Sequence, residues 1–353
     1  MEVDDMVANA FEAQGFADSL NPAEDWFADD VPALSDDAMR GVYREMVEMR
    51  KLEEAAGKAY GKGKISGFLH LYIGQEAVAS GSTAAMRPSD YMISGYRDHA
   101  QALAKGISGK AIMAELFGKA TGCSKGKGGS MHMYDAGKRF LGGDGIVGGQ
   151  IPLAAGVGWA IQYRKSDDAI VCFFGDAASN QGVFHEALNM SMLWNLPVVY
   201  VVENNLYGMG TAISRTSATN TLSQRALAYD MPMERVDGQH FIRMYETMHR
   251  ALERARKGVP TLVEAVCYRF RGHSVSDPAT YRTRDEVDQA RMKDPIKVVK
   301  AIMEARGIAD ADWFKETDKE VKAVVAEAVA FADESPVPPE EWIWEDVLVG
   351  DEV

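Results

Sequence analysis

The 353-residue chain is 46% apolar, which is enough for one large or two smaller α/β domains, and its formal net charge is −14. Its three cysteines, Cys123, Cys172 and Cys267, are far apart and form no CxxC pair, which argues against a disulfide framework or a zinc site and is typical of a reducing compartment. No apolar run approaches the roughly 18 residues of a membrane span, and no targeting pattern precedes Arg40, so we expect a cytoplasmic, bacterial protein that does not enter a membrane.

Acidic residues gather at both ends of the chain. Residues 1–37 hold eleven acids and no base, and residues 323–353 hold nine acids and no base, which leaves 32 acids against 38 bases, a net of +6, in between. The overall charge argues against nucleic-acid binding, whereas the mildly basic middle suits an anionic ligand. We predict a flexible acidic arm over 1–34, a folded domain over 35–333 and an acidic tail over 334–353.

The first predicted helix begins after Ser35, which can cap a first turn that contains Asp36 and Asp37. Apolar residues at helical spacing from Met39 to Met49 give it a buried stripe, and the glycine-rich segment YGKGKISG ends it. Shorter helices are predicted over 75–85, 98–105 and 109–118.

Residues 119–150 differ from the rest of the chain. Glycine and lysine dominate this segment, and it shows neither helical nor strand periodicity, so we predict a long functional loop. Its string GDGIVG, residues 143–148, matches the dinucleotide pattern GxGxxG. Because no apolar strand is expected before the string, we disfavour a nicotinamide dinucleotide site.

From residue 151 onward, apolar β-branched runs alternate with helical patterns. The runs AIVCFF and PVVYVVE are continuous, largely β-branched and apolar, as expected for parallel strands that are buried on both faces. This predicts an α/β fold with a doubly wound, mostly parallel sheet flanked by helices. Strands are predicted over 169–174, 197–203, 233–236 and 261–268, and helices over 151–163, 180–194, 240–257, 285–306 and 312–332.

The first of these strands runs into FFGDAASNQG, where an acid follows the apolar run. Ligands bind at the carboxyl ends of parallel strands, and Asp176 lies at such an end. Gly175 permits a tight turn there, and Ser179 or Asn180 can cap the next helix, whose first amides favour an anion. Taken alone, Asp176 is more often a helix cap than a ligand.

The next strand ends in ENNLYGMG. Taken alone, Asn204 and Asn205 are typical of a turn, but their amide oxygens also suit a metal. If the two strands are neighbours, Asp176 and Asn205 converge. A carboxylate, an amide oxygen, a backbone carbonyl and diphosphate oxygens would then complete the octahedron that Mg²⁺ prefers.

The segment GDAASNQGVFHEALNMSMLWNLPVVYVVENNLYGMG resembles the thiamine-diphosphate signature, which begins with GDG and ends with NN. Further motifs within residues 40–305 extend the resemblance to the alpha subunits of two-oxoacid dehydrogenases, and among these to the first component of pyruvate dehydrogenase complexes. These motifs are GFLHLYIGQEA, SGYRDHAQALAKG, SKGKGGSMHMY, GIVGGQIPLAAG and RGHSVSDPATYRTRDE.

The resemblance implies a thiamine-diphosphate-binding fold with thiamine diphosphate and Mg²⁺ as cofactors. The metal ligands would be Asp176, Asn205 and the backbone carbonyl of Tyr207. The diphosphate would be bound by Tyr96, by Arg97, whose guanidinium suits phosphate, and by the amides of Ala177 and Ala178. Gly145 and Val147 would contact the aminopyrimidine through their backbone. This chain departs from the family at Ala177, where glycine is common; a positive φ there would cost alanine about 1 kcal/mol.

Two of the seven histidines are candidate catalytic residues. His273 opens a polar loop after a predicted strand, and His70 lies in FLHLY. Isolated histidines are more often structural, but proton transfer near neutral pH suits an imidazole. The resemblance implies that His273 orients the bound intermediate and the lipoyl group, also contacting the cofactor, and that His70 binds substrate and transfers protons. His99 and His132 are expected to be structural or to make loop contacts.

The resemblance also implies partners. Thiamine chemistry needs a glutamate that the beta subunit supplies, so this chain alone should be inactive and the active site should lie between chains. The expected assembly is an α2β2 heterotetramer that serves the lipoyl domains and core of a dihydrolipoyl acetyltransferase. Ser274 lies in the loop whose equivalent in animal relatives is phosphorylated on serine. We disfavour regulation by phosphorylation at Ser274 in this chain.

Several functions stay open at this point. The leading hypothesis is decarboxylation of pyruvate and reductive acetylation of the lipoyl group, favoured by YRDH and ENNLYGMG. Acetoin dehydrogenase is the main alternative, and branched-chain two-oxoacid dehydrogenase fits less well. A non-catalytic assembly partner is a different class, and the intact residues Asp176, Asn205, His70 and His273 argue against it.

Overall fold

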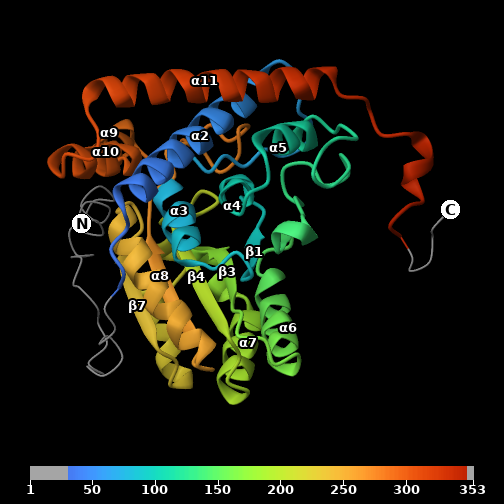
Figure 1. Ribbon diagram of the computed structural model, residues 1–353. Helices are drawn as coiled ribbons and strands as arrows, with labels where there is room; N and C mark the ends of the chain where they lie inside the picture. Colours follow the sequence, from blue (N-terminus) through green and yellow to red (C-terminus); the bar gives the residue numbers. More distant parts are fainter. Residues whose placement is uncertain (1–30, 348–353) are drawn as a thin grey trace.

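The computed structural model describes residues 31–347, and its centre is a six-stranded parallel sheet in the order β2-β1-β3-β4-β8-β7 (Figure 1). The chain leaves β1 towards β2 and then returns to the other side of β1 at β3. Because crossovers between parallel strands are right-handed as a rule, this reversal places helices on both faces of the sheet, and the predicted doubly wound α/β sheet is confirmed. The strands are β1 (Tyr91–Gly95), β2 (Phe140–Asp144), β3 (Ile170–Gly175), β4 (Val198–Asn204), β7 (Met233–Asp237) and β8 (Thr261–Val266), with a separate antiparallel pair, β5 (Tyr207–Gly208) and β6 (Thr211–Ala212).

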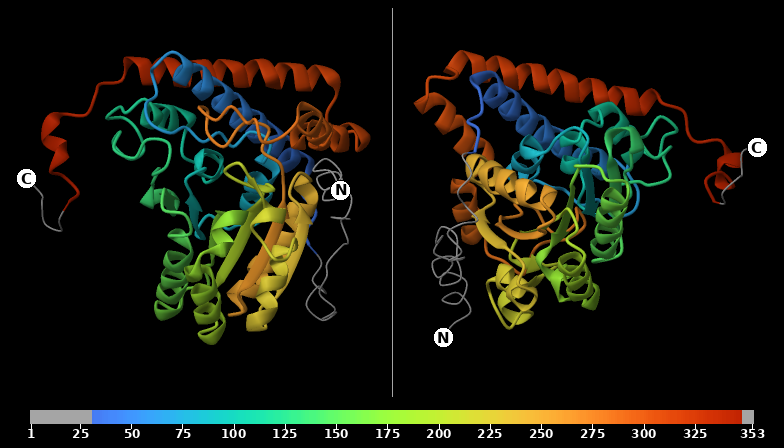
Figure 2. Two further views of the ribbon diagram at one scale, coloured as in Figure 1. Left: turned by 180° about the vertical axis from the view of Figure 1, so that it is seen from behind. Right: turned by 60° about the horizontal axis from the view of Figure 1, so that its bottom comes forward.

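Helices surround the sheet, and α2 and α11 lie side by side across one end of the molecule (Figures 1 and 2). Helix α3 packs against α8, and α6 packs against α7 and β3. The helices are α2 (Asp36–Gly61), α3 (Glu76–Ala85), α4 (His99–Ala104), α5 (Gly109–Leu116), α6 (Gln150–Tyr163), α7 (Gly182–Leu193), α8 (Phe241–Arg256), α9 (Arg284–Met292), α10 (Pro295–Ala305) and α11 (Ala311–Glu334).

The three central strands, β3, β4 and β8, are mostly apolar in sequence and buried along their length. Phe173, Tyr200 and Val263 are fully buried on them, together with nearly all their neighbours. Removing this much apolar surface from water from both faces of the sheet is the main stabilising term of the core. The strands predicted from the sequence therefore agree with the observed ones to within two residues at each end.

The two strands at one edge of the sheet were not predicted. Strand β1 has only five residues, and β2 has the sequence FLGGD with two glycines, which pack no side chain and weaken a strand signal. The expectation that 119–150 is loop throughout is therefore wrong at β2. Strand β2 runs into GDGIVG and ends at Asp144 within it, but its sequence FLGGD is not the apolar strand that a dinucleotide site needs.

Local capping chemistry explains two helix boundaries. The hydroxyl of Ser35 accepts a hydrogen bond from the amide of Ala38 at 3.2 Å, so the predicted cap of α2 is confirmed. The predicted helix over 285–306 is instead two helices. Asp294 caps the second one by accepting from the amide of Ile296, and Pro295, which has no amide hydrogen to donate, occupies its first turn.

The predicted arm over 1–34 lies almost wholly outside the described residues. Within them, the hydroxyl of Tyr245 donates to the carbonyl of Pro32. Of the acidic tail, the part up to Val347 contacts the glycine- and lysine-rich loop, where Asp346 pairs with Lys125 and Lys127, both at 3.0 Å. In the described part of the chain, no helix is long and apolar enough to cross a bilayer.

Candidate functional site

A cavity of about 250 Å³ lies where β1, β3 and β4 end, at the point where the strand order reverses. Ligands bind at this position in doubly wound sheets. The sequence-predicted residues that line it are Tyr96, Arg97, Val147, Asp176, Ala177, Ala178, Asn205, Tyr207 and His273. His70 and Gly145 do not line this cavity, although the His70 ring lies 4.6 Å from the Tyr96 ring, measured between centroids.

The three candidate metal ligands share one cationic neighbour. One guanidinium nitrogen of Arg269 donates to Asn205 Oδ1 at 3.1 Å and to the Tyr207 carbonyl at 3.2 Å. Burial raises the pKa of Asp176 to about 6, and the charge of Arg269 opposes that shift. Asp176 Oδ2 has no hydrogen-bond partner in the described structure. An orphaned carboxylate oxygen beside two neutral oxygens that already bind a cation fits a hard divalent metal such as Mg²⁺.

The candidate metal ligands include only one carboxylate, so they do not form a cluster of acidic, histidine or cysteine side chains. Among the described residues, no three His, Cys, Asp or Glu side chains are placed to share a metal ion. A site at Asp176 would therefore depend on the neutral oxygens of Asn205 and Tyr207, and on oxygens of the cofactor.

The turn after Asp176 differs from the expectation. Residues Asp176–Asn180 form a 3-10 turn, η3, and α7 begins two residues later with no side-chain cap, so the predicted caps at Ser179 and Asn180 are wrong. The Ser179 hydroxyl instead donates to the Asp176 carbonyl at 2.6 Å, which tightens the turn. Ala177 is not among the residues with positive φ, so alanine imposes no backbone strain there.

Arg97 is buried against the backbone. Its guanidinium donates to the Leu71 carbonyl at 2.7 Å and to the His273 carbonyl at 2.8 Å, which ties β1 to the loop after β8. Burial lowers the pKa of Arg97 to about 10, and the charge of the neighbouring Arg269 adds to the shift, so Arg97 remains charged at neutral pH. Two buried cations at the strand ends make this cavity attractive to an anion.

The two candidate catalytic histidines lie together. Their ring centroids are 5.1 Å apart, and the Tyr96 ring contacts both. Burial, reinforced by the charge of Arg97, lowers the pKa of His70 to about 3 and that of His273 to about 4. Both imidazoles are therefore neutral near pH 7. The Nδ1 atom of each is buried without a partner in the described structure, so either Nδ1 can donate a hydrogen bond to a ligand or accept one from it.

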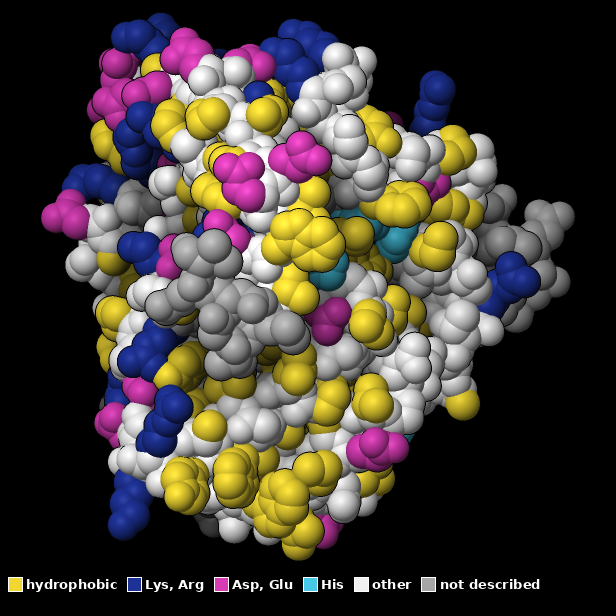
Figure 3. All heavy atoms as spheres, turned by 90° about the vertical axis from the view of Figure 1, so that its right-hand side faces the viewer, with side chains coloured by type: hydrophobic (Ala, Val, Ile, Leu, Met, Phe, Trp, Pro, Cys, Tyr) yellow, Lys and Arg dark blue, Asp and Glu magenta, His cyan; other side chains and the backbone are white. Residues whose placement is uncertain are grey.

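The surroundings of the histidines are open on one side. Figure 3 shows histidine side chains in a hollow bordered by hydrophobic side chains on this face of the molecule. Phe68 is 64% exposed and Val147 is 42% exposed, although both are large and apolar. Exposed apolar groups beside a polar hollow are typical of a site that another surface covers.

Sequence reasoning missed a buried polar layer beneath the site. His99 is buried and bonds Glu53 at 3.0 Å and the Ser130 hydroxyl at 2.9 Å, which fits the expected structural role. Glu203 accepts hydrogen bonds from Tyr72 and Gln101. These acids lie far apart in the sequence, and no spacing links them. Arg269 was equally unforeseen, because it looks like one of several loop arginines.

Known proteins resemble this chain over most of its length. Residues 44–341 match the family described as "Dehydrogenase E1 component". The pyruvate dehydrogenase E1 component subunit alpha of Rhizobium meliloti is 48% identical over 309 residues, which cover 87% of this chain and 89% of the relative. The protein of the same name from Zymomonas mobilis is 46% identical, over 87% of this chain and 88% of its own. A chloroplastic rice protein, subunit alpha-3, is 42% identical over 87% of this chain and 75% of its own.

Proposed function

The chain belongs to the dehydrogenase E1 component family, and we propose that it is the alpha subunit of a pyruvate dehydrogenase that releases CO₂ from pyruvate and reductively acetylates a lipoyl group. The observation that carries the proposal is the convergence of Asp176, Asn205 and the two neutral histidines at the switch point of the sheet, in a chain with relatives of that name. Family membership implies dependence on thiamine diphosphate, which supplies the nucleophilic carbon and the electron sink when bound.

The cofactor would be held by groups from three strand ends. Asp176, Asn205 and the Tyr207 carbonyl would bind Mg²⁺. Tyr96, Arg97 and the amides of Ala177 and Ala178 would face the diphosphate, and the backbone of Gly145 and Val147 would face the aminopyrimidine. The oxygen set and the buried cations around the cavity support this assignment.

The two histidines would act on the substrate side. Their neutral state leaves each imidazole able to accept a proton, which suits His70 for proton transfer and His273 for orienting the substrate and the lipoyl group. An anion bound beside Arg97 would offset one of the charges that depress their pKa values. We therefore expect cofactor binding to raise both pKa values towards the working pH.

A beta subunit would complete the site. The alpha chain offers a large apolar surface for it on α6 and α7, where Leu153 and Trp159 are more than half exposed and Tyr163 is 76% exposed (Figure 3). Helix α6 is apolar all round, although only one side packs on the sheet. We propose an α2β2 heterotetramer in the cytoplasm that serves the lipoyl domains and core of a dihydrolipoyl acetyltransferase.

Co-expression with the beta subunit tests this function. We expect turnover of pyruvate that needs thiamine diphosphate, Mg²⁺ and both chains, and much slower turnover of 2-oxobutyrate, branched-chain oxoacids and acetoin. Faster turnover of acetoin or of branched-chain oxoacids than of pyruvate would mean that the chain is instead the alpha subunit of the corresponding dehydrogenase. Turnover by the alpha chain alone would contradict a site shared between the subunits.

Metal binding can be tested apart from turnover. Asp176→Asn should weaken Mn²⁺ binding in the presence of thiamine diphosphate by at least about tenfold, measured by electron paramagnetic resonance, because the only charged protein ligand is lost. Asp167→Asn is the matched control, since its carboxylate is 86% exposed and, among the described residues, pairs with Arg87 alone. Unchanged Mn²⁺ affinity in Asp176→Asn would mean that Asp176 is not a metal ligand and that the metal binds at another site.

A further inference from the structure

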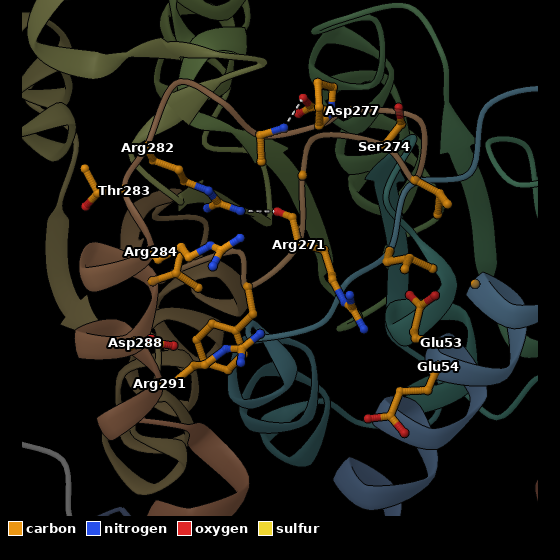
Figure 4. Close-up of a pocket in the computed structure, with 18 of the residues that line it drawn as sticks. Glu53, Glu54, Arg271, Ser274, Asp277, Arg282, Thr283, Arg284, Asp288 and Arg291 are labelled. Atoms are coloured by element: carbon orange, nitrogen blue, oxygen red, sulfur yellow. Dashed lines mark hydrogen bonds between the residues drawn. The ribbon is translucent and has the colours of Figure 1, made fainter. Parts of the chain in front are cut away.

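A second and larger cleft lies on the other side of the loop that carries His273. Its volume is about 940 Å³, and it is bounded by α2 near Glu53–Lys58, by the segment Phe270–Arg284 and by α9 (Figure 4). Neither the candidate metal ligands nor the two histidines line it. The cleft and the cofactor cavity are therefore separate spaces that share one loop as a wall.

Cationic side chains from three elements face this cleft. Figure 4 shows Arg284 and Arg291 on one side and Arg271 approaching from the loop. In the described structure, no hydrogen bond or ion pair joins the side chains of Arg271, Arg284 or Lys58 to another residue, and Arg291 only lies over the Phe270 ring, 5.9 Å from its centroid. Arg282 differs, because it donates to the carbonyls of Arg269 and Arg271.

The acids of the cleft do not neutralise these cations. Glu53 accepts from the Tyr72 amide and bonds His99. Asp277 accepts from the amides of His273 and Ala279 and from the Tyr281 hydroxyl. Glu54 lies 3.8 Å from Lys51, which leaves Asp288 as the lining acid with no partner in the described structure. The cleft is lined by five cationic side chains against four acids, and Lys58, Arg271 and Arg284 have no acid partner among them in the described structure, so an added anion would join like charges that otherwise repel.

We propose that this cleft is a binding site for a small organic phosphate. Guanidinium groups match the geometry of phosphate oxygens with paired hydrogen bonds, and those of Arg271, Arg284 and Arg291 line this cleft without a hydrogen-bond or ion-pair partner in the described part of the chain. The volume lies at the upper end of the range of small-molecule sites, about 300–1,000 Å³. Leu71 and Val275 add apolar lining that suits the carbon skeleton of such a ligand.

Occupancy of the cleft would be linked to the cofactor site through the shared loop. Arg271 is two residues from His273, and the Arg271 carbonyl is held by Arg282. A phosphate that orders Arg271 and Arg284 favours one position of the loop, so it changes the affinity for any ligand on the other face, and the effect is reciprocal. The cleft thus gives the proposed enzyme a site for regulation by a phosphorylated metabolite.

Isothermal titration calorimetry on the assembled alpha–beta enzyme, saturated with thiamine diphosphate and Mg²⁺, tests the proposal. Glucose 6-phosphate is the probe, and saturation of the cofactor site keeps the probe out of it. We expect a Kd below about 1 mM, which corresponds to about −4 kcal/mol. Arg284→Ala and Arg271→Ala should each weaken binding by at least about fivefold, and Arg284→Lys should weaken it less. Arg306→Ala, an exposed arginine on another surface, should leave it unchanged.

Three results would overturn the phosphate site. They are no binding of glucose 6-phosphate, equal binding to the Arg284→Ala enzyme, and equal binding of succinate at matched ionic strength, which would indicate only charge attraction. Loss of affinity for an acidic lipoyl domain in these variants, without any phosphate binding, would make the cleft a protein-docking surface instead. Pyruvate turnover should stay within about twofold in both variants, so failure here is distinguishable from failure of the proposed function.

Discussion

The segment from Arg269 to Arg284 presents arginines on two faces, and these arginines differ in burial and in their hydrogen-bond partners. On the side of the strand ends, Arg269 is 1% exposed and donates to Asn205, Tyr207, Met209 and Tyr281. On the side of α2 and α9, Arg271 and Arg284 are exposed and have no partner in the described structure.

This difference shows that residue type alone does not assign a role in an arginine-rich loop. Leaving the acceptors around Arg269 without a donor would cost free energy, so that arginine serves the fold as well as the site. An exposed arginine remains solvated without a partner, and it contributes little to stability until a ligand arrives. The first kind should respond strongly to substitution in unfolding experiments, and the second kind should respond mainly in binding experiments.

The largest effect is expected at Arg269. Arg269→Gln should lower the free energy of unfolding by about 2–4 kcal/mol, because several buried oxygens lose their donor and Asp176 loses its neighbouring positive charge. Urea unfolding of the alpha chain, followed by circular dichroism, measures this change. Arg306→Gln is the control and should stay within about 0.5 kcal/mol. A loss as small as that of the control would mean that the face towards the strand ends does not anchor the loop.

Two aspartates near the site should respond to pH in opposite directions. Asp98 is fully buried, and burial raises its pKa from 3.8 to about 7, with the charge of His99 opposing the shift. The folded protein therefore keeps a proton that the unfolded chain has lost, and this group lowers stability as pH rises from about 4 to 7. Asp98→Asn should remove that dependence and stabilise the protein by about 2–4 kcal/mol at pH 8, with almost no gain at pH 4.

Asp277 provides the opposite case. Partial burial acts against ionisation, but hydrogen bonds from His273, Ala279 and Tyr281 hold the pKa of Asp277 below its usual value. Its stabilising effect is present above the unfolded pKa and disappears as pH falls through the lower folded pKa. Asp277→Asn should therefore cost about 1–2 kcal/mol at pH 7. Hydrogen exchange should show faster exchange at the His273 amide, and equal exchange at pH 7 would contradict its role as an anchor of the loop.

The sequence predicts much of this site because parallel strands bring their carboxyl ends together. Asp176 and Asn205 follow two long apolar strands, so neighbouring strands were enough to place them side by side. Strand β1 is short, and β2 contains glycines, so their pattern carries little signal. Tyr96 and Arg97 could be identified only through a family resemblance, although they follow β1 directly.

The roles of the loop residues could not be read from the sequence in the same way. Arg269 and Arg271 are two positions apart in a single motif, and only the direction of each side chain separates an anchored arginine from an exposed one. The acids beneath the site, Glu53 and Glu203, come from α2 and β4, and tertiary packing brings both to Tyr72, whose amide donates to Glu53 and whose hydroxyl donates to Glu203. At Ala177 the sequence suggested a strain that the structure does not show. Its φ is not positive, so alanine in place of the family's common glycine does not strain the backbone.

The smallest effect tests the comparison most directly. The double variant Arg271→Ala/Arg284→Ala removes two cations from the cleft, and within residues 31–347 neither side chain has a hydrogen-bond or ion-pair partner to lose. We expect the free energy of unfolding to change by less than about 0.5 kcal/mol, with a slight gain at low salt because like charges no longer repel. The gain should vanish at 0.5 M NaCl. A loss of more than about 1 kcal/mol at either salt concentration would mean that these arginines hold the fold together, and the two faces of the loop would then not differ.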